Sequence, residues 1–482
     1  MAERTLAEQL ARFAVANQYD TLPAEVTQSV RMRVLDILGI CVASSTLDTS
    51  YSAREFVASQ GGNPHALGIG MGRRVPATQA AFINGVLAHS LDYDDTHLPS
   101  VLHPSASVVP AAIAAAEEVD ADGRALIAAI TCGLEVCVRL GMVGYDEETR
   151  NSVFFEHGQH ATSICGAMGA AVAVGLLYGF DEPAITHSLG VAGSMASGII
   201  EANRTGGTVK RMHCGWAAHA GVSAAQLVRH GVTGPPTVLE GRFGFFEAWL
   251  HGRGNVAALT DGLGEDWEVP RIFFKPYPAN HFTHTAIDAA AALRRDGLDP
   301  NQIESIELGV AGPIVRTLGE PIEVKRAPET GYMAQFSGPY AVVAGLLGGG
   351  GLEVSLEDYS NELAQDPRRR QLMSLVSVVE DQRCSEIFPH QFPSILRVRL
   401  RDGTELVQEA LVNRGGPERP LSYEELATKF RDNVGQLLTA AAAEQLASRV
   451  ARLNELENTR ELLAPLADFI ATPPHLTPHR AN

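Results

Sequence analysis

The sequence predicts a mostly helical protein: a large all-α domain formed by the N- and C-terminal segments, with an inserted α+β domain. Two observations predict this fold class. Apolar residues recur at helical spacing through most of the first half of the chain and again near its end. Between these parts, alternating apolar and polar residues are typical of strands. The predicted parts are a helical domain over 1–270, the α+β domain over 271–417, the rest of the helical domain over 418–470 and a disordered tail over 471–482.

The first part contains most of the predicted helices. Their apolar spacing places them at 5–17, 23–45, 76–95, 105–118, 123–142, 161–178, 182–200 and 212–230. The glycine-rich stretch 61–74 is predicted to be a loop. Small residues dominate segments such as 166–173, and they allow helix axes to approach closely. We therefore expect tight helix packing in a soluble core.

The inserted part carries the strand signals. One strand is predicted at 306–310, and a hairpin is predicted from Leu396 to Val412 with Asp402-Gly403 at its turn. Helices are predicted at 332–347 and 356–376, and a linker at 414–420. The pair Ser422 and Glu425 predicts a capping box that opens the C-terminal helices.

Composition excludes several classes of partner. The chain has 482 residues and a net charge of −18, which argues against nucleic acid or an anionic membrane as the main partner. The early apolar run 34–43 is too short to span a bilayer, and no secretory leader is recognisable, so we expect a cytoplasmic protein. The six cysteines are scattered without metal-binding spacing and are expected to be reduced thiols.

The stretch 88–104 concentrates polar residues between two apolar segments. It holds three carboxylates, a threonine and three histidines. If the helix that begins after Pro76 continues through it, His89, Asp92 and Thr96 share one helix face. His103 lies between two prolines and is predicted in a turn. The alternative interpretation is an ordinary polar helix end.

Four further polar clusters interrupt the apolar pattern. Each has a structural alternative: N-capping by Thr162, a solvated basic turn, a proline-rich linker, or packing of a tyrosine. Together they bring cations and proton-carrying groups to the edges of predicted elements, as in a polar cleft. Their candidate residues are His160, Lys210 with His213, Lys275 with His281, and Tyr340.

These segments resemble the MmgE/PrpD family, which includes 2-methylcitrate dehydratase, cis-aconitate decarboxylase and iminodisuccinate epimerase. The resemblance rests on four segments and runs from about residue 5 to 465. They are Arg31–Gly39, His89–Thr96 with His103-Pro104-Ser105, Lys210 with His213-Cys214-Gly215, and Lys275-Pro276-Tyr277-Pro278. The resemblance implies that the inserted α+β domain is a lid domain. It also implies a homodimer with an active site between the two domains and no metal or organic cofactor. It implies the catalytic residues Asp92, His103, His160, Lys210 and Lys275, and the substrate-binding residues Thr96, His213, His281 and Tyr340.

The chemistries of this family pass through a carbanion or enolate next to a carboxylate. We predict a dehydratase that acts on a hydroxylated di- or tricarboxylate such as 2-methylcitrate. An epimerase or decarboxylase acting on a related acid is the alternative within the family, and a non-catalytic helical scaffold is the alternative from another class. Asn280 stands where decarboxylase-like members carry a histidine, and the loop from Thr96 to His103 is one residue longer than theirs. The Asn280 departure argues against cis-aconitate decarboxylase itself, and the longer loop argues against the assignment of His103.

Overall fold

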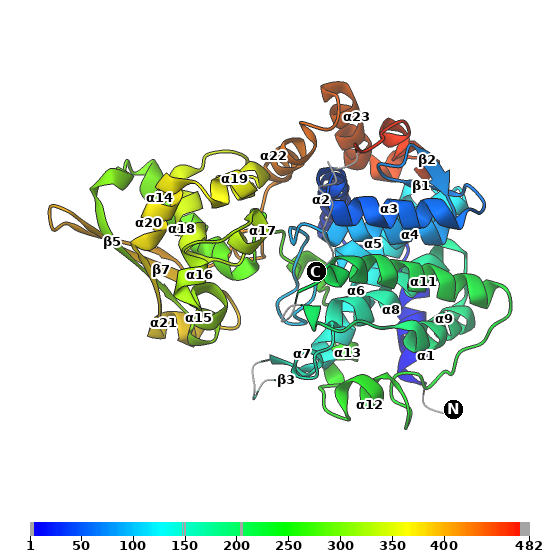
Figure 1. Cartoon of the computed structure of the whole chain (residues 1–482). Helices are drawn as coiled ribbons and strands as arrows, with labels where there is room; N and C mark the ends of the chain where they lie inside the picture. Colours follow the sequence, from blue (N-terminus) through cyan, green and yellow to red (C-terminus); the bar gives the residue numbers. More distant parts are fainter. Residues whose placement is uncertain (1–3, 147, 149–150, 203–205, 473–482) are drawn as a thin grey trace. The chain divides into compact units, whose positions relative to one another are not determined.

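The computed structural model describes residues 4–146, 148, 151–202 and 206–472. These residues form two compact units, 1–272 with 433–482 and 273–432. Figure 1 shows that the first unit is built from helices and that the second combines helices with a sheet. The predicted fold class, a mostly helical protein with an α+β segment between two helical parts, is confirmed.

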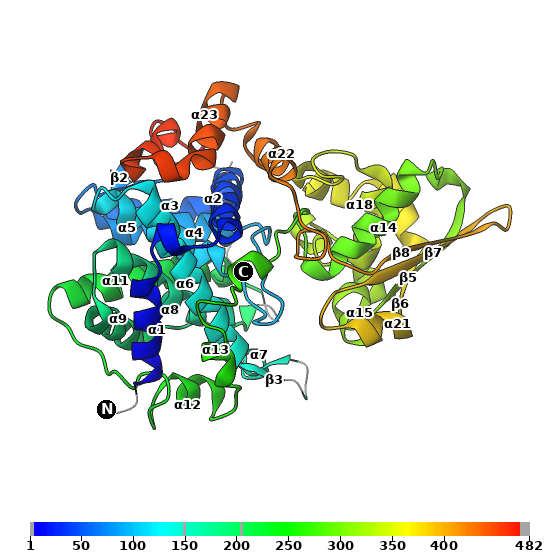
Figure 2. The same ribbon diagram turned by 180° about the vertical axis from the view of Figure 1, so that it is seen from behind.

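The first unit is a bundle of helices around α8, Ala161–Leu177. Helix α8 packs against α5, α6, α9 and α11, and α1 packs against α9 (Figure 2). The longer helices of this unit are α1 Leu6–Ala16, α2 Ala24–Ser44, α3 Asp48–Gln60, α4 Ala77–His89, α5 Ser105–Glu118, α6 Gly123–Val143, α9 Glu182–Met195, α11 His213–Arg229 and α23 Ala440–Ala451. Shorter elements are α7 Val153–Glu156, α12 Phe245–Leu250, α13 Ala257–Thr260 and the 3-10 helix η2 Val209–Met212.

Small residues set the spacing between the central helices. A Cβ atom on Gly133 of α6 would lie 2.7 Å from the Gly169 carbonyl oxygen of α8, too close for any side chain. Likewise, a Cβ atom on Gly85 of α4 would lie 2.7 Å from the Gly215 Cα of α11. The predicted close helix packing is therefore confirmed. Helix α6 is long and apolar enough to cross a membrane, but 94% of its most apolar window is buried inside the protein, as in a core helix.

Three predictions about local structure are wrong in this unit. The helix predicted over 76–95 ends at His89, because Ser90 closes its last turn and Asp92 adopts a left-handed backbone with φ of 52°. The helix predicted over 182–200 ends at Met195. The stretch 61–74, predicted to be a loop, contributes to a short antiparallel pair formed by β1 Ala66–Gly68 and β2 Arg73–Val75. Another short pair joins β3 Tyr145–Asp146 to β4 Asn151–Ser152.

The second unit contains a four-stranded sheet in the order β6-β5-β7-β8. Its strands are β5 Ile303–Val310, β6 Val376–Glu380, β7 Ser394–Leu400 and β8 Glu405–Ala410. The predicted strand and hairpin are confirmed, since β5 covers 306–310 and β7 pairs with β8 across the turn. Helices α14 His284–Arg295 and α18 Gly338–Leu347 pack against each other, and α14 also contacts β7 and β8.

The remaining helices of the second unit are short. The predicted helix 332–347 is split into α17 Gly331–Ala334 and α18, because the Ser337 hydroxyl accepts from the Tyr340 N–H and starts a new helix. The predicted helix 356–376 is split into η6 Leu356–Tyr359, α19 Asn361–Ala364 and α20 Pro367–Ser374, and β6 begins at Val376. The other short helices are α15 Gly312–Gly319, α16 Ile322–Lys325 and α21 Gln382–Ile387.

Helix α22, Tyr423–Val434, lies mainly in the second unit, so the division falls at 432/433 rather than at the predicted 417/418. Lys429 of α22 donates a hydrogen bond of 2.8 Å to the Lys275 carbonyl oxygen, which ties the helix to that unit. The capping box predicted at its start is confirmed: the Glu425 N–H donates to the Ser422 hydroxyl, and the Ser422 N–H donates to the Glu425 carboxylate. Of the predicted tail, residues 473–482 lie outside the described residues, whereas the buried Ala471 donates to the Gly70 carbonyl oxygen.

Candidate functional site

His89 is the last residue of α4, and its imidazole is buried in the first unit. Its Nδ1 lies 2.7 Å from the Asp94 Oδ2, and Asp94 is fully buried. Burial is the largest single effect and disfavours the imidazolium, but the charges and hydrogen bonds of Asp94 and Cys214 together raise the pKa of His89 to about 10. The pair is therefore an imidazolium hydrogen-bonded to a carboxylate.

The loop after α4 folds back and positions His103. The His103 Nδ1 lies 2.6 Å from the Asp95 carbonyl oxygen and 3.2 Å from the Thr96 hydroxyl. A carbonyl oxygen only accepts, so the Nδ1 carries a proton and, in the neutral ring, the Nε2 is the nitrogen that can accept one. Thr96 and His103 are therefore brought together by a loop. The predicted helix face shared by His89, Asp92 and Thr96 is not observed, because α4 ends at His89.

A buried ion pair anchors this loop. The Arg33 guanidinium of α2 donates to the Asp95 carboxylate at 2.7 Å, and both side chains are buried. The Ser105 N–H and hydroxyl also donate to Asp95, at the start of α5. Arg33 further donates to the carbonyl oxygens of Val269 and Ile272. Arg33 thus holds together three segments that are distant in sequence: α2, the loop that carries His103, and 269–272.

His160 and His213 face each other at the starts of two helices. His160 is the N-cap of α8, and His213 is the first residue of α11. Their Nδ1 atoms are 2.9 Å apart, so one donates to the other. Burial and the nearby His89 and Lys210 charges lower the pKa of His160 well below its usual range, and the same causes lower that of His213 to about 4. Both rings are therefore neutral near neutral pH.

Lys210 supplies the flexible positive charge of the site. It lies in η2, directly before α11, and its Nζ is 3.6 Å from the Asp92 Oδ1. The Lys210 side chain is 18% exposed, whereas that of Asp92 is 7% exposed. A strongly hydrated ammonium on a flexible stem can exchange this partner for the carboxylate of a ligand.

Three helix N-termini meet at this cluster. The His103 N–H, just before α5, donates to the Thr162 hydroxyl in the first turn of α8 at 3.1 Å. The Ser163 hydroxyl, in the same turn, donates to the His213 carbonyl oxygen at 3.1 Å. Helix N-termini carry partial positive charge, and together with Lys210 they favour an anion. The predicted N-capping by Thr162 is not observed, because its hydroxyl serves His103 instead.

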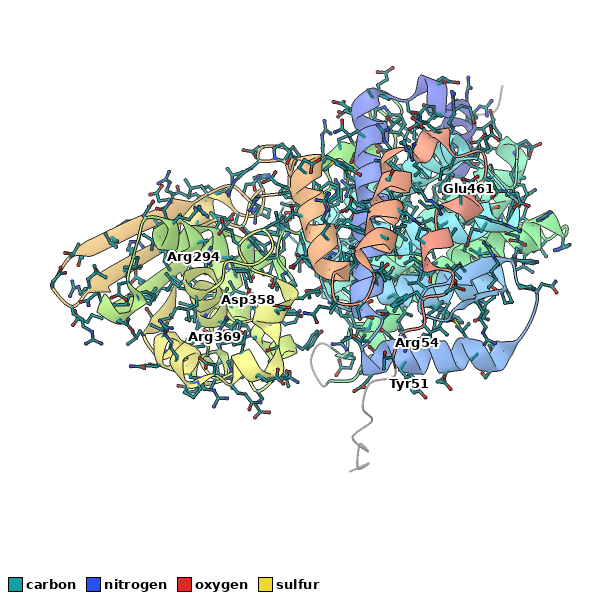
Figure 3. The ribbon with its side chains drawn as sticks, turned by 90° about the horizontal axis from the view of Figure 1, so that it is seen from above. Tyr51, Arg54, Arg294, Asp358, Arg369 and Glu461 are labelled. Carbon is teal, nitrogen blue, oxygen red and sulfur yellow. The ribbon has the colours of Figure 1, made fainter. Side chains whose placement is uncertain are left out.

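The three remaining predicted residues belong to the second unit. Lys275 and His281 are buried there, and the His281 ring packs against Phe273 and His284. The Tyr340 hydroxyl is buried and donates to the Asp358 carbonyl oxygen, and Arg369 donates to it at 3.2 Å. Arg369 also pairs with the Asp358 carboxylate at 2.9 Å (Figure 3). Tyr340 thus has the packing role that the sequence left open. The catalytic role of Lys275 and the substrate-binding role of His281 and Tyr340 stay predictions.

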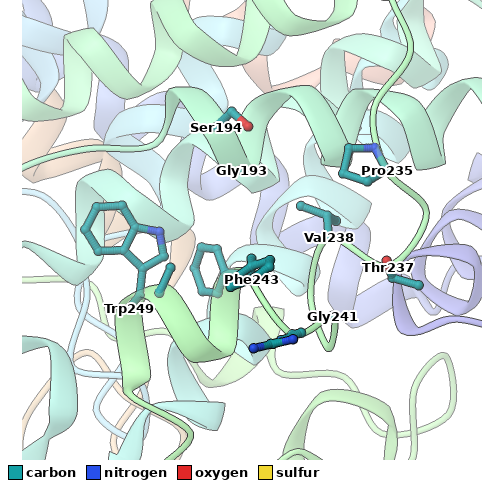
Figure 4. Close-up of a pocket in the computed structure, with 12 residues that line it drawn as sticks. Gly193, Ser194, Pro235, Thr237, Val238, Gly241, Phe243 and Trp249 are labelled. Atoms are coloured by element: carbon teal, nitrogen blue, oxygen red, sulfur yellow. The ribbon is translucent and has the colours of Figure 1, made fainter.

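A surface pocket of about 300 Å³ lies elsewhere in the first unit, between the end of α9, the loop 235–244 and α12. Arg242, Phe243 and Trp249 contribute to its lining (Figure 4). Among the described residues that line it, none is a predicted site residue. Nor do the described residues include a group of three or more His, Cys, Asp or Glu side chains arranged to hold a metal ion.

Sequence reasoning did not place His89, Asp94, Asp95 and Arg33 in the site. His89 and Asp94 carried a local signal, because a histidine and a carboxylate five residues apart in one polar stretch can form an ion pair where the chain turns. Arg33 carried none, since its partner lies 62 residues away. The six predicted residues that the structure does bring together in the first unit are Asp92, Thr96, His103, His160, Lys210 and His213.

Comparison with known proteins gives matches along nearly the whole chain. Residues 8–256 match the MmgE/PrpD N-terminal domain, and residues 277–455 match the MmgE/PrpD C-terminal domain. Human cis-aconitate decarboxylase is 29% identical over 454 residues, which cover 91% of this chain and 89% of that protein. Cis-aconitate decarboxylase of Aspergillus terreus is 24% identical over 478 residues, covering 94% and 93%. The mitochondrial 2-methylcitrate dehydratase of Yarrowia lipolytica is 24% identical over 207 residues, covering 41% and 38%. The chain therefore belongs to the MmgE/PrpD family.

Proposed function

We propose that this protein is a lyase that acts on a small polycarboxylate through a carbanion or enolate next to a carboxylate. The observation that carries the proposal is the cluster in the first unit, where Lys210 and three helix N-termini surround the neutral pair His160 and His213. Such a cluster provides positive charge for carboxylates and developing negative charge, together with groups that exchange protons.

Each residue has a distinct role in the proposed chemistry. Lys210 binds a substrate carboxylate and stabilises the enolate that forms beside it. His160 or His103 exchanges protons with the substrate, and Thr96 orients His103 through their 3.2 Å contact. Asp92 holds Lys210 in place until a substrate carboxylate replaces it.

Dehydration of a β-hydroxy acid is the first candidate reaction. It needs a base for the α-proton and an acid for the departing hydroxyl, and the cluster offers imidazoles for both steps. Decarboxylation is the second candidate, because relatives named cis-aconitate decarboxylases match more than nine-tenths of this chain. The Asn280 that replaces a histidine of decarboxylase-like members favours the first candidate.

A substrate panel separates these possibilities. The purified protein is incubated with citrate, 2-methylcitrate, cis-aconitate and substituted succinates, and the products are followed by NMR. Loss of water supports dehydration, and release of carbon dioxide supports decarboxylation. We expect Lys210→Ala and His160→Ala to abolish turnover, whereas His230→Ala, at an exposed histidine, retains it. Absence of turnover of any acid would contradict the proposal and favour a binding scaffold.

A further inference from the structure

Four imidazole rings lie close enough in the first unit to control one another's protonation. The His89 ring centroid is 5.5 Å from that of His103 and 5.8 Å from that of His160. The His160 and His213 centroids are 4.9 Å apart. At these separations a charge on one ring opposes a charge on the next, so the four rings cannot all be imidazolium.

The helix ends divide these rings into two groups. His89 closes the C-terminus of the 13-residue helix α4, where the macrodipole favours a cation. His160 and His213 open the 17-residue helices α8 and α11, where the macrodipole disfavours a cation. The backbone alone therefore promotes the charged form of the first ring and the neutral form of the other two.

Direct contacts reinforce this division. The Asp94 carboxylate, 2.7 Å from the His89 Nδ1, satisfies an imidazolium there. The 2.9 Å contact between the Nδ1 atoms of His160 and His213 accommodates a single proton, so these two rings cannot both be cations. The directions of the pKa shifts agree, because that of His89 is raised and those of His160 and His213 are lowered.

We propose that His89 is a positioning residue: with Asp94 it forms a permanent buried imidazolium–carboxylate pair that keeps His160 neutral and so makes His160 the proton acceptor of the site. The titratable and charged groups that surround this pair belong to every neighbouring element. They are Asp95 and His103 of the loop, Cys41 of α2, Lys210 of η2, His160 of α8, and His213 and Cys214 of α11.

The proton follows a balanced path. The substrate α-carbon loses its proton to the ring nitrogen of His160 that does not face His213, and the electron pair left on carbon spreads into the adjacent carboxylate. The electron pair next forms a carbon–carbon double bond as the C–O bond to the β-hydroxyl breaks. The charge on His160, which the nearby His89 opposes, favours release of its proton to the departing hydroxyl, which leaves as water. The assignment of His160 as the group that takes and releases the substrate proton rests on the proposed function, whereas the protonation states of the rings do not.

The protonation states are measured directly on the full chain. Wild-type protein with 15N-labelled histidine is titrated by NMR from pH 6 to 9, and the His89 and His160 signals are assigned with His89→Gln and His160→Gln. We expect both His89 nitrogens to stay protonated and His160 to stay neutral over the whole range. A neutral His89 or a protonated His160 at pH 7 would overturn the proposal, whether or not an acid is turned over.

Two variants test the proposal through the direction in which the pKa of His160 moves. In His89→Gln, the pKa of His160 should rise by roughly one unit, since a nearby positive charge is gone. In Asp94→Asn, loss of a negative charge would by itself lower the pKa of His160, but the proposal predicts a rise, because His89 becomes neutral without its partner. In both variants, the pH at which kcat/KM falls on the acidic side of the profile should move to a higher value. His230→Gln should leave that pH unchanged. A fall of the His160 pKa in Asp94→Asn would overturn the proposal. If either variant does not fold, the wild-type titration decides.

Discussion

Lys210 combines a partly exposed ammonium with a weak buried partner. Its Nζ lies 3.6 Å from Asp92, beyond the length of a good hydrogen bond, so the ion pair is easily exchanged. We predict that Lys210→Met lowers kcat/KM by roughly 100-fold or more, the loss expected for one group that stabilises an oxyanion. Lys210→Arg should retain part of the activity, because it keeps the charge. The matched control is Arg211→Met, since Arg211 donates to Thr49 of α3. An equal loss in this control would contradict the role of Lys210.

The His89–Asp94 pair makes stability depend on pH in a definite direction. The pKa of His89 is about 10 in the folded protein and close to 6.5 when unfolded. A raised pKa contributes stability that is fully present below about pH 6.5 and is lost as the pH rises through 10. Urea unfolding at pH 6, 8 and 10 should therefore show that the free energy of unfolding of wild type exceeds that of His89→Gln by less at each higher pH. A constant difference would mean that His89 is neutral.

At the scale of elements, helix starts and caps could be predicted from neighbouring residues, whereas contacts between residues distant along the chain could not. The start of α5 at Ser105 and the Ser422–Glu425 capping box follow from neighbouring residues, and both are confirmed. The end of α4 at His89 was not predicted. Helical spacing continues past it, but the chain turns at Asp92 and carries the next carboxylate, Asp95, to Arg33. Tertiary contacts thus override the local pattern in the stretch that builds the site.

The same limit applies to the imidazole pair. His160 and His213 are 53 residues apart, and their contact depends on how α8 packs against α11. Each segment could be identified as polar and cationic from its residues. Their 2.9 Å contact, which prevents both rings from being cations at once, is a property of helix packing.

The packing of α4 against α11 is the element-scale feature that holds His89 near His213. A Cβ atom on Gly215 would overlap the Phe82 carbonyl oxygen, and backbone cannot move aside as a side chain can. We predict that Gly215→Ala lowers the free energy of unfolding by about 1–3 kcal/mol and displaces the start of α11. Chemical denaturation measures this change. Ser223→Ala, on the same helix, serves as the control and should cost less. Unchanged stability in Gly215→Ala would mean that the helices have room to separate.

At the scale of the whole molecule, the family match extends over both units, and the candidate lysines Lys210 and Lys275 belong to different ones. We predict that both contribute to the same reaction. A double-mutant cycle of Lys210→Met and Lys275→Met in kcat/KM tests this. Residues that act as a unit are non-additive, so the double variant should lose much less than the product of the single losses. Independent, multiplicative losses would contradict a shared role. Circular dichroism checks that Lys275→Met, at a buried position, is folded.

Deuterium incorporation tests the central claim most directly. The protein is incubated in D2O with citrate-like and succinate-like acids, and hydrogen next to a carboxylate is followed by NMR. Our account predicts that at least one acid gains deuterium at that carbon with wild type, and that Lys210→Met and His160→Gln slow the incorporation strongly. Failure of every acid to gain deuterium, or equal incorporation by the two variants and wild type, would contradict a site that forms a carbanion beside a bound carboxylate.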